Sequence, residues 1–260
     1  MKARSMGVMA LSVLLASGAA GCKTGKPGFR AQTMRPDQQH DFAVLYKGNC
    51  SACHGDRGMS GAALPLDNPV YLTWAGHDRL IEIVANGVPH RLMPGFSATA
   101  GGFLTDSQIE NIVHGMLSQW TKPGILNGAN IPAYTPATPG DARQGKAAFQ
   151  IYCARCHGPD GAGVPPGDSA AAKGLAVGSI VDPTYLSLIS PRALRDVIVT
   201  GRPRENMPDW RGDAAGKPMT GKDVTDIVAW LGSHRVHIPG KPFPSSSQQR
   251  ETSRHSAERE

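Results

Sequence analysis

The chain has 260 residues, of which 40% are hydrophobic and only 6% aromatic, and its formal net charge is +6. This length suits two modest domains better than one small one, and an apoprotein with so few aromatic side chains would build a thin core. The basic residues are scattered along the chain with no block of five or more, which argues against a nucleic-acid-binding surface.

The N-terminus has the features of an export signal. After a charged start, Met6–Ala20 carries no charge, and a run this short is typical of the hydrophobic region of a signal peptide more than of a membrane-spanning helix. The segment LASGAAGC (15–22) ends in small residues before a cysteine, which resembles a bacterial lipoprotein signal. We therefore expect 1–21 to be a signal peptide, Cys22 to carry the lipid anchor, and 22–37 to be a linker. The protein would then lie at the periplasmic face of a bacterial membrane; an ordinary cleaved signal and an uncleaved anchor remain alternatives.

The segment 38–120 is predicted to form a first helical domain. A short helix near 38–48 precedes CSACH (50–54). After Thr105, the stretch DSQIENIVHGMLSQW places apolar residues at helical spacing, behind a residue type that begins helices well. The stretch 121–140, rich in proline and glycine, is predicted to be a linker.

The segment 141–238 repeats this order of elements. A short helix near 141–152 precedes CARCH (153–157), and a closing amphipathic helix follows Thr220. The remaining residues, 239–260, are polar and are expected to be a disordered tail.

Sequence matches between the two halves indicate an internal duplication. DRLIEIVANGVPHRLMPGF (78–96) aligns with RALRDVIVTGRPRENMPDW (192–210) at a constant offset of 114 residues. The alignment pairs Met93 with Met207, each followed by proline. The two CxxCH copies lie 103 residues apart, so an insertion of 11 residues follows CARCH in the loop-like stretch 161–178. Because both halves keep CxxCH and a methionine, the two features are predicted to belong to one site in each half.

CxxCH is the attachment motif of c-type haem. Its two thiols can add to the two vinyl groups of the porphyrin, and the following histidine then lies under the iron. The sequence thus predicts two covalent haems, attached at Cys50 and Cys53 and at Cys153 and Cys156, with His54 and His157 as proximal iron ligands. A zinc site, a redox dithiol and structural disulfides are weaker interpretations. Each cysteine pair sits inside its own repeat, and disulfides would leave the histidines and methionines unexplained.

Met93 and Met207 are the candidates for the sixth iron ligand. Each is predicted to lie in a loop after a helix, and a thioether is a soft ligand that raises the reduction potential of a histidine-ligated haem. His77 and His90 compete in the first half, but the second half has no histidine at the matching positions. The duplication therefore favours methionine.

The second ring nitrogen of each proximal histidine should donate a hydrogen bond to a backbone carbonyl, which orients the ring. The expected acceptors are Pro65 in the first half and Pro165 or Pro166 in the second.

With these motifs in place, each half resembles a class I cytochrome c domain. The resemblance implies an all-α fold with two tandem domains, each wrapped around one covalent haem. The second half has the glycine and closing aromatic typical of the family, at Gly145 and Trp230. The first half departs from that pattern with Phe42 and Gly115, and Trp120 is expected to substitute in part for the missing aromatic.

The resemblance implies outer-sphere electron transfer rather than enzyme catalysis, because two six-coordinate haems leave no open position for a substrate. Together with the lipid anchor, it implies a respiratory carrier between a quinol-oxidising complex and a terminal oxidase. The alternatives are a dihaem peroxidase, which would need a displaceable ligand on one iron, and the cytochrome subunit of a periplasmic dehydrogenase.

Overall fold

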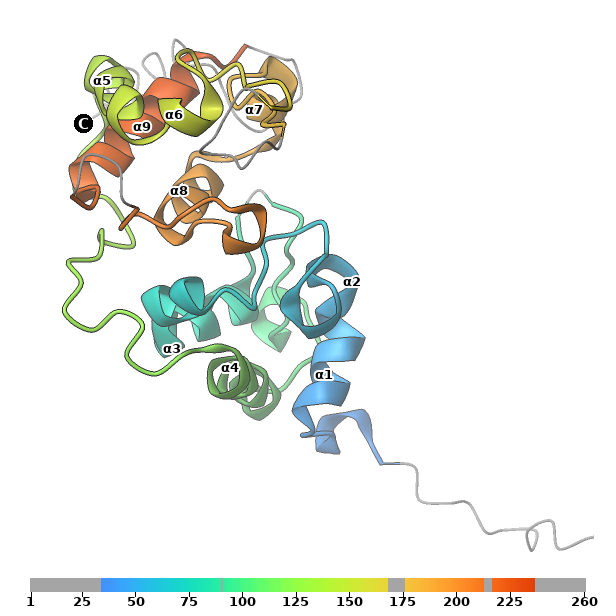
Figure 1. Ribbon diagram of the computed structural model, residues 1–260. Helices are drawn as coiled ribbons and strands as arrows, with labels where there is room; N and C mark the ends of the chain where they lie inside the picture. The colour runs from blue at the N-terminus through green and yellow to red at the C-terminus, as the bar shows by residue number, and fades with distance from the viewer. Residues whose placement is uncertain (1–33, 90, 168–175, 213–216, 237–260) are drawn as a thin grey trace, which may run out of the picture. The chain divides into compact units, whose positions relative to one another are not determined.

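The computed structural model describes residues 34–89, 91–167, 176–212 and 217–236, and the regular elements in these ranges are helices joined by loops (Figure 1). Extended backbone pairing in them is limited to isolated bridges, such as the one between Arg202 and Met207. The all-α fold class is thus confirmed. The expectations for 1–21, Cys22 and 239–260 lie outside the described residues, as does His90.

Two groups of helices follow one another along the chain. The first repeat contains α1 (Phe42–Asn49), α2 (Ser51–His54), α3 (Pro69–Asn86) and α4 (Asp106–Trp120). The second repeat contains α5 (Ala142–Tyr152), α6 (Ala154–His157), α7 (Pro183–Leu188), α8 (Pro191–Thr200) and α9 (Gly221–Ser233). Single 3-10 turns occur at η1 (Pro36–Gln38), η2 (Asp56–Gly58), η3 (Ala98–Ala100) and η4 (Pro203–Glu205).

The closing helices begin where the sequence predicts. The side chain of Thr105 accepts a hydrogen bond from the Gln108 backbone, and the Gln108 side chain accepts one from the Thr105 backbone, which makes a capping box. Thr220 and Asp223 form the same reciprocal pair at the start of α9. Each box satisfies two backbone N–H groups that a helix start leaves without partners.

The duplication is also visible in the backbone. α3 is one run of helix with a kink at Gly76, where φ is 72° and ψ is 168°. The matching position of the second repeat, Ser190, separates α7 from α8 and caps α8 by accepting from the Ala193 N–H at 2.8 Å. Because glycine readily adopts positive φ, the chain of the first repeat can bend at Gly76 while α3 continues, whereas the second repeat has two separate helices, α7 and α8.

The opening and closing helices of each repeat cross through a small residue packed against a large one. In the second repeat, Gly145 of α5 lies against α9, and a Cβ built on it would stand 1.9 Å from the Asp226 carbonyl oxygen. In the first repeat the sizes are exchanged, since a Cβ on Gly115 of α4 would stand 2.1 Å from the ring of Phe42 on α1. The departure seen in the sequence is therefore a complementary exchange that preserves the crossing.

Aromatic side chains complete both crossings. Trp120 packs edge-on against Phe42 and Tyr46, with ring centroids 5.6 and 5.0 Å apart, as expected for its substituting role. In the second repeat, the rings of Phe149 and Trp230 lie 4.3 Å apart. Such pairs stabilise a core beyond the area that they bury.

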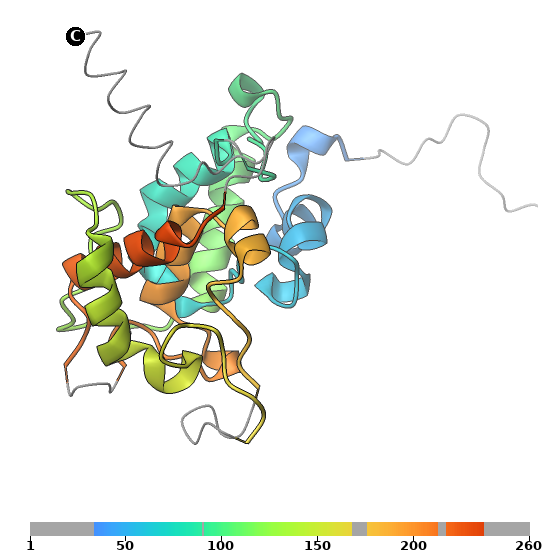
Figure 2. The same ribbon diagram turned by 90° about the horizontal axis from the view of Figure 1, so that it is seen from above.

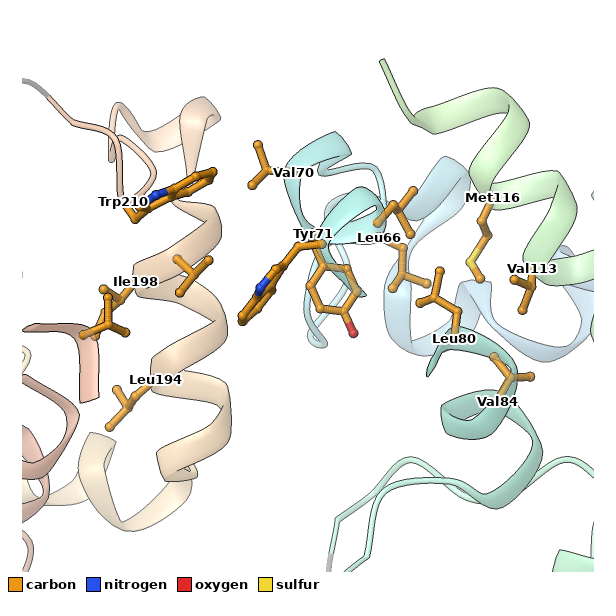
Figure 3. Packing of buried hydrophobic residues seen from close by; sticks show 14 of the residues in the cluster. Leu66, Val70, Tyr71, Leu80, Val84, Val113, Met116, Leu194, Ile198 and Trp210 are labelled. Atoms are coloured by element: carbon orange, nitrogen blue, oxygen red, sulfur yellow. The ribbon is translucent and has the colours of Figure 1, made fainter. Parts of the chain in front are cut away.

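The two repeats pack directly against each other through α3 and α8 (Figure 1, Figure 2). Figure 3 shows Val70 and Tyr71 of α3 on one side of α8, and the α8 side chains Leu194 and Ile198 on the other side of that helix. All four side chains are buried. α8 is therefore covered on both sides, and the repeats form one continuous core.

The linker 121–140 is tied to both repeats. The indole N–H of Trp74 on α3 donates to the Pro132 carbonyl at 2.7 Å. From α8, Arg192 donates to the Tyr134 carbonyl at 2.6 Å and stacks over the Tyr134 ring, with its guanidinium carbon 3.3 Å from the ring centroid. Arg195 donates to the Ala133 carbonyl at 2.6 Å.

Candidate haem-binding sites

Both CxxCH motifs coil into a single helical turn. In the first repeat, the Cys53 and His54 N–H groups donate to the Cys50 carbonyl at 3.2 and 3.0 Å. In the second, the Cys156 and His157 N–H groups donate to the Cys153 carbonyl at 3.1 and 3.0 Å. The structure thus brings the two predicted thiols and the predicted imidazole of each repeat onto one turn with the same hydrogen bonding.

The four cysteines of the motifs are free thiols. Burial, reinforced by the neighbouring cysteine, raises the pKa of Cys50 to about 12 and that of Cys153 to about 12. A buried thiol of this kind stays protonated at neutral pH and resists oxidation.

His54 is oriented by the backbone. Its Nδ1 lies 2.8 Å from the Leu64 carbonyl oxygen, so the ring donates this proton and leaves Nε2 as the free ligand atom. Burial lowers the pKa of His54, and the hydrogen bond to Leu64 partly offsets that effect. The expectation that Pro65 accepts this bond is wrong by one residue, because the carbonyl that faces the ring belongs to the residue before the proline.

His157 has a different environment. Its Nδ1 is buried and has no hydrogen-bond partner among the described residues. Burial alone lowers the pKa of His157. The prediction that Pro165 or Pro166 accepts from this ring is therefore wrong, although both residues lie within the described part of the chain.

Met93 lies in the loop after α3. It is half-buried and packs against the hydrophobic core, as Cys50 does. Its carbonyl accepts from the Val88 N–H at 3.1 Å, which closes the loop that carries it.

Met207 lies at the end of a tight hairpin after α8. Its backbone exchanges two hydrogen bonds with Arg202, at 2.9 and 3.1 Å, so the position of the methionine is fixed relative to the end of α8. The side chain is half-buried and lines a cleft of about 580 Å³ together with Asn68 and Ile125. The ligand roles of Met93 and Met207 remain predictions.

The competing histidine of the first half is already engaged. His77 is hydrogen-bonded on both ring nitrogens, to Asp78 at 2.9 Å and to Glu110 at 2.8 Å. These two hydrogen bonds raise the pKa of His77. A ring held by two carboxylates offers no free nitrogen to an iron, which agrees with the preference for methionine.

The side chains of each repeat fit a c-type haem. Each offers two free thiols on one turn, an imidazole whose burial keeps it neutral, and a thioether in a half-buried loop. The buried Nδ1 of His157 has no protein partner among the described residues, so this ring departs from the usual pattern in which the second nitrogen of an iron-ligating imidazole donates to the protein.

Comparison with known proteins gives the family. The family model described as "Cytochrome C oxidase, cbb3-type, subunit III" matches residues 37–114 and again 140–231. The chain belongs to this family. It is a tandem class I c-type cytochrome that binds two haems, and both matched segments contain a CxxCH turn and a Met-Pro loop.

Two curated relatives are similar over one part of the chain. One is the cbb3-type cytochrome c oxidase subunit CcoP of Rubrivivax gelatinosus, 34% identical over 128 residues, which cover 48% of this chain and 36% of the relative. Another is the subunit FixP of Sinorhizobium medicae, 29% identical over 140 residues, which cover 48% of this chain and 43% of the relative. The chain thus spans less than half the length of the curated relatives that it matches.

A solved structure from the reducing HAO-like protein complex of Kuenenia stuttgartiensis aligns with a TM-score of 0.36 and 18% identity, over 75% of this chain and 95% of that one. A match at that score carries no argument about fold or function. In the described part of the chain, no helix combines the length and apolar character needed to cross a membrane.

Sequence reasoning missed two residues near these sites. Leu64 is the residue before the expected Pro65, and the sequence has no signal for which of these two carbonyls faces the His54 ring. Asn68 carries no signal in the sequence that would indicate its partner in the other repeat.

Proposed function

We propose that this protein is an electron carrier in which each repeat holds one haem with its own side chains. The proposed attachment and axial residues are Cys50, Cys53, His54 and Met93 in the first repeat, and Cys153, Cys156, His157 and Met207 in the second. The proposed domains are 38–120 and 141–238, which the family matches at 37–114 and 140–231 support. The observation that carries the proposal is the same coiled CxxCH turn in both repeats, with a half-buried Met-Pro loop downstream of each.

When bound, haem supplies an iron that changes charge by one electron. The protein's part is to hold that iron in one coordination state. The thiols of each turn would attach the macrocycle, and the neutral imidazole, through Nε2, and the methionine thioether would hold the iron. With both axial positions filled by protein, neither site has room for a substrate, which favours a carrier over a peroxidase.

The partner is proposed from the relatives, which are named as subunits of cbb3-type oxidases. We infer that this chain delivers electrons to a terminal oxidase at a membrane and receives them from a quinol-oxidising complex. We further propose a lipid anchor at Cys22 and a periplasmic location. Cys22→Ala should then move the protein from the membrane fraction to the soluble fraction. The anchor is refuted if Cys22→Ala stays with the membranes and its N-terminus differs in mass from that of the wild type only by the substituted residue.

The ligand assignment is tested on the full chain, matured in a host that attaches c-type haem. The wild type should carry two covalent haems per chain and show the weak long-wavelength band of methionine bound to ferric iron. Met93→Leu and Met207→Leu should each remove about half of that band. Met116→Leu is the matched control, because Met116 is a buried core residue that should leave the band intact. A double variant, Met93→Leu with Met207→Leu, that keeps the band would refute both assignments.

The electron-transfer role is tested by mixing the reduced holoprotein with membranes that contain a cbb3-type oxidase and with membranes that lack it. Rapid oxidation only in the first case is the expected result. Equal rates with both membranes would refute the oxidase as partner. Fast oxidation by hydrogen peroxide, together with a high-spin iron, would instead indicate that the protein reduces peroxide.

A further inference from the structure

Asn68 joins the two repeats at the N-terminus of α3. Its side-chain oxygen caps that helix, accepting from the Val70 and Tyr71 N–H groups at 3.0 and 3.2 Å. Its side-chain nitrogen points the other way and donates to the carbonyls of Thr200 and Gly201, 3.1 and 3.3 Å distant and more than 130 residues later in the chain. The last carbonyls of a helix lack partners within it, so Asn68 supplies the end of α8 with a donor from the first repeat, beside the longer bond of 3.5 Å from the Thr200 hydroxyl to the Gly201 carbonyl.

The end of α8 carries the Met207 hairpin. Gly201 has φ of 66°, and the returning chain passes so close that a Cβ on Gly201 would stand 2.6 Å from the Pro208 carbonyl carbon and 2.6 Å from the Asp209 nitrogen. Met207 lies directly before Pro208 and is bonded twice to Arg202. Any shift of Gly201 therefore moves the backbone on both sides of Met207.

Two further features of the same region link the first repeat to this hairpin. Arg204, at its tip, forms an ion pair with Asp67, the residue before Asn68. Asn68 and Met207 also line one cleft. The hairpin is thus held at its base by a buried amide and at its tip by an exposed charge pair.

The position that matches Asn68 makes a local bond instead. The position that matches Asn68 is Asp182, whose side chain caps α7 by accepting from the Tyr185 N–H at 2.8 Å. The Met93 loop closes on its own repeat, through the Val88 N–H and through the Phe96 N–H, which donates to the Val84 carbonyl at 3.0 Å. The amide bond between the repeats is therefore made by Asn68 and not by its equivalent, Asp182.

We propose that Asn68 is a positioning residue for Met207, so that the first repeat completes the axial ligation of the haem in the second. The inference rests on the proposed function, in which Met207 is an iron ligand. Without the amide bond, the hairpin should be looser and Met207 should be displaced more readily from the iron.

Asn68→Asp isolates this role. Aspartate keeps the oxygen that caps α3, but it replaces the donor with an oxygen that faces two carbonyls. Asp182→Asn is the matched control, since it makes the reverse isosteric change at the equivalent position and keeps the cap of α7. Both changes are made in the full holoprotein carrying Met93→Leu, so that the remaining methionine–iron band belongs to the second repeat.

The readouts are the intensity of that band and the affinity of the ferric iron for added imidazole, which competes with the methionine. Asn68→Asp should weaken the band and raise the imidazole affinity about tenfold or more, because two buried carbonyls lose their donor. Asp182→Asn should change neither. If Asn68→Asp does not acquire haem, the same two readouts are taken on Asn68→Ser, because serine still caps α3 but is too short to reach α8.

A full band and unchanged imidazole affinity in the Asn68 variant would overturn the inference. An equal loss in Asp182→Asn would overturn it too, because the effect would then not depend on the bond between repeats. Failure of the proposed ligand is a separate result. In that case Met207→Leu keeps the band in the Met93→Leu background, independently of the result with the Asn68 variants.

Discussion

The crossing of α5 over α9 allows a sharp test of the packing. Gly145 lies at the contact, and a Cβ there would stand 1.9 Å from the Asp226 carbonyl oxygen and 2.8 Å from the Trp230 Cβ. The nearest obstacle is backbone, so no side-chain rotation can relieve it and the helices must separate. Gly145→Ala should therefore destabilise the second repeat even though alanine is the better helix former.

The expected cost follows from two opposing effects. Overpacking of a well-filled core costs about 3 kcal/mol at the upper end of its usual range, and replacing glycine by alanine inside a helix returns about 1 kcal/mol. The net loss of unfolding free energy should be about 2 kcal/mol, measured by denaturant unfolding of the holoprotein. Haem attachment per chain should be quantified in the same samples.

Gly48→Ala is the matched control. Gly48 also lies in an opening helix, but it is exposed and a Cβ there would meet nothing within 4 Å. This variant should gain about 1 kcal/mol of stability from helix propensity. If Gly145→Ala proves as stable as the wild type, or if both variants shift in the same direction, the close crossing of α5 and α9 is not what the second repeat requires.

Three other predictions concern single groups. Burial raises the pKa of Asp196 from 3.8 to about 6, so its contribution to stability is present below pH 3.8 and is lost as the pH rises through about 6. Asp196→Asn should flatten the pH dependence of unfolding over that window, and an unchanged slope would contradict this origin. Trp74→Phe removes the donor to the Pro132 carbonyl, so it should lower the free energy of unfolding by about 1–2 kcal/mol and speed proteolysis of the linker. Equal cleavage rates in the variant and the wild type would contradict the role of this bond in holding the linker. The haem ligated by His157 should have a higher reduction potential than the haem ligated by His54, by about 20–60 mV, because of these two rings only that of His54 donates to a carbonyl. A redox titration that shows the reverse order would refute this.

The parts of the fold that the sequence predicts well are set by local chemistry. The starts after Thr105 and Thr220 were predictable because a capping side chain and an amphipathic run coincide there. The first helix starts at Phe42, later than expected, since the Asp41 side chain accepts from the Val44 N–H and fixes the start. The complementary exchange of Phe42 and Gly115 was seen only as a departure from a pattern.

What the sequence could not predict depends on contacts between distant residues. The bond from Asn68 to α8 joins positions with no shared motif, and it exists only because α3 and α8 pack together. The acceptor for His54 was misplaced by one residue, since periodicity and composition do not fix which carbonyl of a loop turns inward. Such contacts are settled by tertiary packing rather than by the local pattern.

The duplication therefore produced two similar haem turns in unequal surroundings. His54 donates to Leu64 whereas His157 has no acceptor among the described residues, and the helix end that carries the Met207 hairpin is bonded to Asn68 of the other repeat. A hydrogen bond from the imidazole makes it a stronger donor and stabilises ferric iron, which lowers the potential of the first site relative to the second. Electrons that enter at the first repeat would then move downhill to the second, and the same first repeat would hold the receiving methionine in place. A directional carrier requires two unequal sites, and the differences lie outside the motifs that the repeats share.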